Sequence, residues 1–243
     1  YGLLGYPLAV SFSPAYFTEK FERLHLQHRY LLFPRPTVAD LRSWIADQPD
    51  LAGLNVTIPH KQAVVEQLDD LTTEAKATGA VNTILIQRNP LRLVGHNTDV
   101  VGFEQSLRVL VGDARPAAMV LGTGGAARAV WYVLQALGIP FLKVGRQPAD
   151  EVFSYASLRP EQLASHPLWI NTTPLGMEPT FALQKPALLY EALTSSHLLY
   201  DLVYHPAETP FLEQGRKAGA KTQNGLAMLH AQAEASWTFW QNK

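Results

Sequence analysis

A glycine-rich turn between an apolar run and a long helical pattern constrains this chain more than any other feature. The apolar run Ala117 to Leu121 predicts a buried strand, and the pattern after the turn predicts a helix of about four turns. Gly122 permits a tight turn, Gly124 lets the backbone approach a pyrophosphate, and Ala127 lets the helix pack close to the strand. An ordinary glycine-rich turn is the alternative, but a strand before it and a helix after it favour a dinucleotide site.

The next predicted strand, at 141–144, indicates which dinucleotide would bind. It ends about 20 residues after the first glycine, where the adenosine ribose of a dinucleotide lies in such folds. An NAD enzyme usually has an acidic residue there, whereas this chain has Gly145-Arg146-Gln147. The guanidinium of Arg146 suits a 2′-phosphate, which favours NADP. The alternative is a solvated surface arginine, and the nearby Asp150 would partly repel a phosphate.

Strand and helix patterns alternate along the chain, which is typical of α/β proteins. We expect two lobes with a boundary near residue 102: residues 1–102 together with about 222–243, and residues 103–221. The patterns predict strands at 1–5, 30–33 and 53–58, helices at 14–26, 41–46 and 62–68, a hairpin of 81–86 and 91–95, a helix from Gly102, and a terminal helix at 226–240 that returns to the first lobe.

Composition excludes several classes of function. The net charge is −1 over 243 residues, so no basic excess is available for nucleic acid. The chain has no cysteine, which fits a reducing compartment, and its eight histidines show no metal-ligand spacing. The first residues lack the basic stretch of an export signal, and no apolar run is long enough to cross a bilayer. We therefore expect a cytoplasmic protein with no metal, nucleic-acid or membrane partner.

Polar side chains gather at the ends of predicted elements in the first lobe. Ser11 and Ser13 stand at the start of a helix, with Ser13 as the expected N-cap and Pro14 at the first helical position. Such a helix start would also accept a substrate carboxylate, although a cap alone explains both serines. Asn55 and Thr57 alternate at the end of a strand and point to one face.

One lysine and one aspartate in this lobe suit acid-base chemistry. Lys61 follows the strand that carries Asn55, at a strand-to-helix corner, and Asp99 enters the helix between the lobes. Asp99 would then face the crevice between the lobes, where a carboxylate could pair with Lys61. Taken alone, Lys61 is equally explained as a solvated surface charge.

These segments resemble those of the shikimate dehydrogenase family over nearly the whole chain. The matching motifs are Gly5-Tyr-Pro-Leu with Ser11 and Ser13, NVTIPHK at 55–61, GAVNT at 79–83, NTDVVG at 97–102, GTGGAARA at 122–129, NTTPLGM at 171–177, DLVYHPAETPFL at 201–212 and NGLAMLHAQA at 224–233. The resemblance implies a mostly parallel α/β substrate domain, a Rossmann-like dinucleotide-binding domain, and a terminal helix that packs on the first. It also implies a monomer or a homodimer that binds a small-molecule substrate.

The resemblance also implies an activity and a set of site residues. The expected reaction is NADP-dependent reduction of 3-dehydroshikimate to shikimate, with NADPH as hydride donor, in aromatic amino-acid and chorismate biosynthesis. Lys61 and Asp99 would be the catalytic pair. Substrate contacts would come from Ser11, Ser13, Thr57, Asn82, Tyr204 and Gln232, and the cofactor would be lined by Gly122, Thr123, Gly124, Gly125, Ala126, Ala127, Arg146, Leu202 and Gly225.

The chain departs from the family pattern at three positions, and other readings stay open. Val10 stands where the family usually has histidine, Gly145 where asparagine precedes the arginine, and Asp150 where a second basic residue often grips the phosphate. The alternatives are an NAD-using quinate/shikimate dehydrogenase, a folate-type dehydrogenase of the same two-lobe design, and a ligand sensor without catalysis. The paired serines and clustered Asn and Thr suit a small polyol acid better than a flat pterin.

Overall fold

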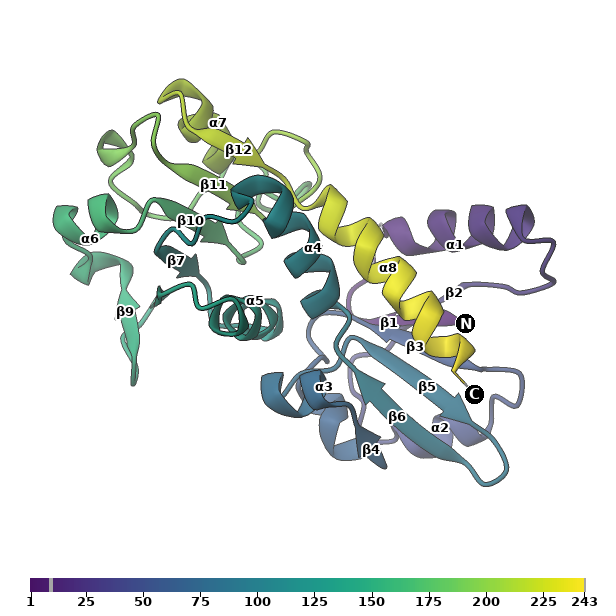
Figure 1. Ribbon diagram of the computed structural model, residues 1–243. Coiled ribbons are helices and arrows are strands. Elements are labelled where there is room, and N and C mark those ends of the chain that lie inside the picture. The colour runs from purple at the N-terminus through teal and green to yellow at the C-terminus, as the bar shows by residue number, and fades with distance from the viewer. Residues whose placement is uncertain (9–10, 243) are drawn as a thin grey trace. The chain divides into compact units, whose positions relative to one another are not determined.

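The computed structural model describes residues 1–8 and 11–242, so Val10 lies outside the described residues. The chain divides into two compact units (Figure 1). Unit 1 comprises 1–98 and 233–243, and unit 2 comprises 99–232. The boundary predicted near residue 102 falls in the first turn of helix α4, Asp99–Val111.

Unit 1 is built on a six-stranded mixed sheet in the order β2-β1-β3-β5-β6-β4. Strands β1, β2 and β3 are mutually parallel, β5 pairs antiparallel with both β3 and β6, and β4 runs parallel to β6. Its elements are β1 Gly2–Gly5, α1 Phe12–Arg23, β2 Leu31–Pro34, α2 Leu41–Ala46, β3 Gly53–Val56, a 3-10 helix Ala63–Gln67, β4 Asp70–Leu71, α3 Thr73–Thr78, β5 Thr83–Gln87 and β6 Arg92–His96.

The end of the chain completes unit 1. Helix α8, Leu226–Gln241, begins in unit 2, and its last turns lie beside β5 (Figure 1). Trp240 is fully buried there, and its indole N–H donates to the carbonyl of Ile84 at 3.0 Å. Its ring packs with Phe17 and Tyr30, which stack on each other at 4.6 Å. The predicted return of the terminal helix is thus confirmed.

Unit 2 is built on a six-stranded sheet in which every pair of strands is parallel, in the order β12-β11-β10-β7-β8-β9. Counted from the first strand of the unit, this is the order 3-2-1-4-5-6 of doubly wound dinucleotide-binding folds. Its remaining elements are β7 Ala118–Leu121, α5 Gly125–Ala136, β8 Phe141–Gly145, β9 Val152–Ser154, α6 Pro160–Ser165, β10 Leu168–Asn171, β11 Leu198–Asp201, α7 Pro210–Lys217, β12 Lys221–Gln223 and two 3-10 helices, Tyr155–Ser157 and Tyr190–Ala192.

The core of unit 2 explains why its strand sequences are almost continuously apolar. Helices α4 and α5 lie side by side on the sheet (Figure 1). Their apolar faces pack with β7 and β10 in a cluster that includes Phe103, Val130 and Ile170, whereas Trp169 and Phe211 belong to a second cluster. A parallel sheet with a cluster on each face buries both sides of its strands, so no alternation of polar residues is expected.

Most elements match their predictions, and the differences have local causes. The predicted helix at 62–68 is a short 3-10 helix, and the helix expected from Gly102 begins at Asp99. The prediction that Ser13 caps a helix beginning at Pro14 is wrong. Ser11 is the N-cap, with extended backbone angles, and Ser13 lies inside the first turn. Pro14 is tolerated as the third residue of the helix because the first amide groups of a helix have no partner within it.

We predict that Trp240→Ala lowers the free energy of unfolding of unit 1 by about 3–5 kcal/mol, because it leaves a cavity and removes the indole N–H that donates to the carbonyl of Ile84. Urea unfolding followed by circular dichroism measures the change. Thr238→Ala, an exposed position on the same helix, is the matched control and should change stability by less than about 0.5 kcal/mol. Equal effects from both variants would contradict an anchoring role for Trp240.

Candidate functional site

Three of the polar residues predicted in the first lobe are joined by hydrogen bonds in unit 1. The Ser13 hydroxyl is a partner of the Tyr30 phenol, which donates to Asn55 Oδ1 at 2.8 Å. Asn55 Nδ2 donates to the carbonyl of Asn82 at 3.3 Å. Ser13, Asn55 and Asn82 are all at least nine-tenths buried. Buried polar groups are costly unless they are paired, so this chain fixes each side chain in one position.

The terminal helix contributes one hydroxyl to this cluster. Ser236 Oγ, fully buried, accepts from Asn55 Nδ2 at 2.9 Å and lies 2.8 Å from Thr83 Oγ1 and 3.0 Å from Thr98 Oγ1. The sequence-based reasoning gave no role to these three hydroxyls. The sequence signal for Ser236 was a single serine within a helix rich in alanine and aromatic residues.

Lys61 is held by its backbone close to Asn82. Its carbonyl accepts from the Val81 amide at 2.7 Å, and the preceding turn is closed by a bond from the His60 amide to the Thr57 carbonyl at 2.9 Å. His60 is buried, and its Nε2 lies 2.6 Å from the carbonyl of Arg35, so that nitrogen carries the proton. The half-buried Lys61 and Thr57 therefore stand on a loop that is fixed from both sides.

Asp99 directly follows Thr98, where the chain passes from unit 1 into unit 2. The amide of Thr98 donates to Asn82 Oδ1 at 2.7 Å, and the Thr98 hydroxyl donates to the same oxygen at 3.1 Å. Asp99 is 6% exposed and is the first residue of α4. Asn82 thereby fixes the point at which the chain leaves unit 1. Ser11, by contrast, is half-exposed as the N-cap of α1 and makes no side-chain capping bond.

In unit 2 the glycine-rich turn has the geometry that its sequence predicts. Gly122 has φ +116°, and a Cβ there would overlap the Thr172 hydroxyl. Gly124 is the N-cap of α5, and a Cβ on it would meet open space. Thr123 and Gly124 are exposed, Gly125 and Ala126 are half-buried, and Ala127 is buried against the sheet. The open turn thus precedes a 12-residue helix whose first amides lack partners within the helix, an arrangement that fits a pyrophosphate.

The tip of β8 combines a crowded glycine with an exposed arginine. A Cβ on Gly145 would lie 3.1 Å from Val152 Cγ1 and 3.3 Å from Thr123 Cγ2, so the backbone here packs closely on both side chains. Arg146 is exposed, and its charge acts on Tyr155, whose pKa burial raises to about 12. Arg146 therefore stands at the end of β8, next to a glycine that packs against Thr123 of the glycine turn.

The structure also brings together two of the predicted cofactor residues, Leu202 and Gly225. The Gly225 amide donates to the Val203 carbonyl at 3.1 Å, and a Cβ on Gly225 would overlap the Leu202 carbonyl. Tyr204 follows on the same loop and is half-buried. Gln232 lies on α8, where its Nε2 donates to the Leu229 carbonyl at 3.0 Å.

A buried carboxyl at the end of β11 was not singled out from the sequence. Asp201 is fully buried and accepts from Asn171 Nδ2 at 2.9 Å, from the Val203 amide at 3.0 Å and from Thr209 Oγ1 at 2.5 Å. Burial raises the pKa of this carboxyl to about 7, although the three hydrogen bonds favour the charged form. Asp201 and Asn171 end adjacent parallel strands, at the edge where the glycine turn lies.

Two broader properties follow from the described parts of the chain. Among residues 1–8 and 11–242, no group of three or more His, Cys, Asp or Glu side chains is placed to hold a metal ion. None of the helices described is both long and apolar enough to span a bilayer.

The strand order, the glycine turn and the open start of α5 together define unit 2 as a Rossmann-like domain, the class in which dinucleotides bind at the first strand-to-helix turn. Residues 3–84 match the model of the shikimate dehydrogenase substrate binding domain. The chain is 40% identical to the shikimate dehydrogenase (NADP(+)) of Oleidesulfovibrio alaskensis, over 100% of this chain and 90% of that protein. The protein belongs to the shikimate dehydrogenase family.

Solved structures agree with this assignment. The shikimate 5-dehydrogenase of Thermus thermophilus, in complex with NADP(H) and shikimate, superposes with a TM-score of 0.86 at 33% identity, covering 100% of this chain and 93% of that one. The quinate dehydrogenase of Corynebacterium glutamicum, in complex with NAD, gives a TM-score of 0.86 at 27% identity, with 100% and 93% covered. Members that differ in substrate and cofactor therefore share this fold.

We predict that the stability of unit 2 decreases as the pH rises through neutrality. The folded-state pKa of Asp201, about 7, lies above the ordinary value of 3.8, so the folded state binds this proton more tightly than the unfolded state does. The proton on Asp201 contributes on the order of 4 kcal/mol to the free energy of unfolding. This contribution is fully present below about pH 4 and is lost by about pH 8. Urea unfolding of wild type and Asp201→Asn across this range measures it. A constant difference between the two proteins would contradict the raised pKa.

Proposed function

We propose that the protein is an NADP-dependent shikimate dehydrogenase that reduces 3-dehydroshikimate to shikimate, a step towards chorismate and the aromatic amino acids. The observation that carries the proposal is the match over the whole chain to a 40% identical relative named for this activity. The open glycine turn of the Rossmann-like unit supports the dinucleotide, and the polar residues gathered in unit 1 support a small hydroxylated substrate.

The cofactor is assigned to unit 2. The turn residues 122–127 fit the pyrophosphate because Gly124 opens to solvent at the start of a helix. Arg146 fits the 2′-phosphate because its guanidinium is exposed at the end of β8. Leu202 and Gly225 complete the lining. NADPH supplies a hydride when it is bound.

Unit 1 is assigned to the substrate. Ser11 and Ser13 stand at the start of α1, where a carboxylate is favoured by the helix dipole. Thr57 and Asn82 offer polar groups to the ring hydroxyls, and Tyr204 and Gln232 are assigned to the same substrate from unit 2. In domain terms, residues 1–102 with about 222–243 bind substrate and 103–221 bind NADP. Turnover then requires the two domains to close on each other.

Lys61 acts as the acid that gives a proton to the carbonyl oxygen of the substrate while the carbonyl carbon is reduced. A lysine ammonium carries that proton at neutral pH, and the carboxylate of Asp99 stabilises the charge and orients a substrate hydroxyl. The fixed backbone of the loop 57–61 supports this role because a proton donor has to be held within hydrogen-bond distance of its acceptor.

An NAD-using quinate or shikimate dehydrogenase is the second candidate, because the Corynebacterium glutamicum enzyme of that kind shares the fold and Asp150 stands where a second basic residue often grips the phosphate. Steady-state rates with NADPH and NADH, on 3-dehydroshikimate and on dehydroquinate, separate the two. The cytoplasmic location and the monomeric or dimeric state stay predictions.

Lys61→Ala should reduce kcat for 3-dehydroshikimate by about a hundredfold or more, because the transition state loses its proton donor. Consumption of NADPH measures the rate. Lys76→Ala removes an exposed lysine from α3 in the same unit and should stay within about twofold of wild type. A Lys61→Ala enzyme within about tenfold of wild type would exclude this acid-base role.

Arg146→Ala should raise KM for NADPH about tenfold or more and leave KM for NADH nearly unchanged, because only the 2′-phosphate loses a charged partner. The ratio of the two KM values is the measurement. Lys221→Ala, an exposed cation on β12, gives the same change in net charge as a control. If both cofactors weaken equally, Arg146 does not read the 2′-phosphate.

A further inference from the structure

Two loops at one edge of the unit 2 sheet are joined to each other along their length. The first, 172–181, follows β10, and the second, 202–209, follows β11. The Leu202 amide donates to the Asn171 carbonyl at 2.9 Å, and the Glu178 amide donates to the His205 carbonyl at 3.3 Å. Gly176 packs so closely on Thr209 that a Cβ would lie 2.9 Å from it. The two loops are therefore packed on each other at several points.

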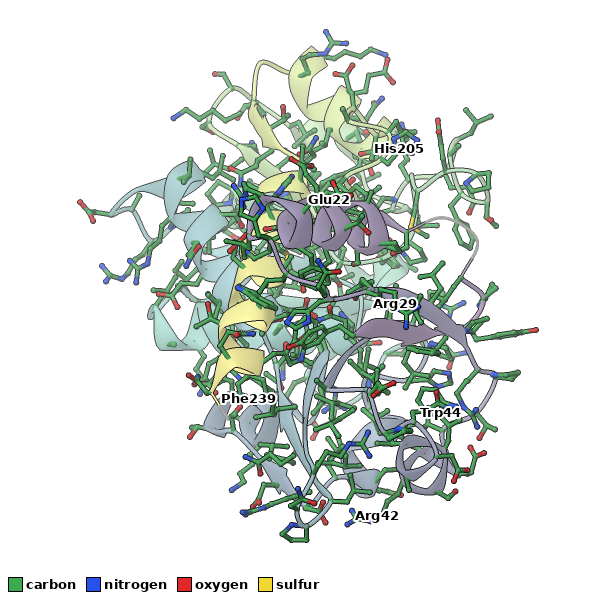
Figure 2. All side chains as sticks on the ribbon, turned by 90° about the vertical axis from the view of Figure 1, so that its right-hand side faces the viewer. Glu22, Arg29, Arg42, Trp44, His205 and Phe239 are labelled. Carbon is green, nitrogen blue, oxygen red and sulfur yellow. The ribbon has the colours of Figure 1, made fainter. Side chains whose placement is uncertain are left out.

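The tip of this loop pair is weakly held. Glu178 Oε2 lies 3.1 Å from His205 Nε2, but the two side chains are 46% and 71% exposed. His205 projects at the surface in Figure 2. An exposed ion pair contributes little to stability because water and salt screen it. The buried side-chain interactions that fix the loop pair lie at its base.

The base is held by Asp201 and Asn171. Asn171 Oδ1 accepts from the amide and the hydroxyl of Thr173, at 3.0 and 2.6 Å, and its Nδ2 donates to the Leu175 carbonyl at 3.2 Å as well as to Asp201. Asp201 accepts from Val203 and Thr209 at the start and the end of the second loop. Both side chains are fully buried. Two adjacent side chains thus fix the start of the first loop and both ends of the second.

The second loop carries residues that the proposed function uses. Leu202 and Tyr204 stand immediately after Asp201, and Gly225 is bonded to Val203. A displacement of about 1 Å at groups that position reactants costs up to about a hundredfold in rate. A residue that sets this loop therefore acts on the reaction without touching the ligands.

We propose that Asp201, paired with Asn171, is a positioning residue for the cofactor: it joins the loops 172–181 and 202–209 into a rigid wall that lines the NADPH site. This inference rests on the proposed function for the identity of the ligand. The joining of the loops is independent of it.

A stabilising role alone would not distinguish Asp201 from other buried polar residues of the strand. His197 precedes β11 at the opposite end and is 3% exposed. Its Nδ1 accepts from the Thr194 amide at 3.1 Å. His197→Ala should therefore lower stability without reaching the loop pair, which makes it the matched control for Asp201→Ala.

The test compares wild type, Asp201→Ala, Asp201→Asn and His197→Ala in the full chain. NADPH affinity is measured by fluorescence titration, and backbone hydrogen exchange is followed in 171–181 and 201–209. Asp201→Ala should bind NADPH about tenfold or more weakly and exchange faster in both segments. Asp201→Asn keeps an acceptor for Asn171 and Val203, and its Nδ2 donates to Thr209 Oγ1 in place of the wild-type bond, so it should stay within about threefold of wild type. His197→Ala should stay within about twofold.

The outcomes separate this inference from the proposed function. If wild type binds NADPH and Asp201→Ala matches His197→Ala in affinity and in exchange, the positioning role is excluded. If wild type fails to bind NADPH, the proposed function fails, and the exchange data still decide whether Asp201 joins the loops. Faster exchange in both loops supports that, and faster exchange in neither refutes it.

A second pair of variants decides the question if Asp201→Ala does not fold. Thr209→Val keeps the shape of the side chain and removes the hydroxyl that Asp201 binds, whereas Thr209→Ser keeps the hydroxyl. Thr209 also caps α7 through its bond from the Leu212 amide, a bond that serine can make. Weaker NADPH binding in Thr209→Val, restored in Thr209→Ser, supports the proposal, and equal binding overturns it.

Discussion

The hydroxyl of Ser236 is the contact on which unit 1 depends, because it brings the far end of the chain into the hydrogen-bond network of the sheet. It meets Asn55, Thr83 and Thr98 at 3.0 Å or less, in a region without exposed surface. A buried network of this kind is stable only when each member is satisfied. This network therefore fixes the last helix and the side-chain amides of the sheet relative to each other. The polar residues of unit 1 are rigid as a result.

In unit 2, the residues assigned to the cofactor lie at one edge of a parallel sheet. Parallel strands end at the same edge, so the glycine turn, the arginine tip of β8 and the loops after β10 and β11 converge there. The loops at this end of the sheet are less rigid than the strands, because they lack the regular backbone hydrogen bonds of a sheet. Asp201 and Asn171 stiffen these loops from the ends of two adjacent strands.

The sequence predicted the elements well because their signals are local. The apolar run before Gly122 and the helical pattern after it lie within one stretch of chain, and the positive φ of Gly122 agrees with the expected tight turn. The cap of α1 was misjudged between Ser11 and Ser13 because two serines two residues apart suit the same helix start equally well. The partnership of Asp201 with Asn171 was missed because residues 30 apart in sequence meet only when two strands pair.

The chemistry of the three donors explains why position 201 carries a carboxylate rather than an amide. Thr209 Oγ1 already accepts from the Leu212 amide at 3.3 Å, so its own proton needs an acceptor. An asparagine that turned its nitrogen to Thr209 would leave that proton without one, and an asparagine turned the other way would face Asn171 and Val203 with a donor. Only a group with two acceptor oxygens satisfies all three donors at once. Burial of this carboxyl raises its pKa and disfavours its charged form. The three hydrogen bonds to Asp201 hold the two loops in one position despite this penalty.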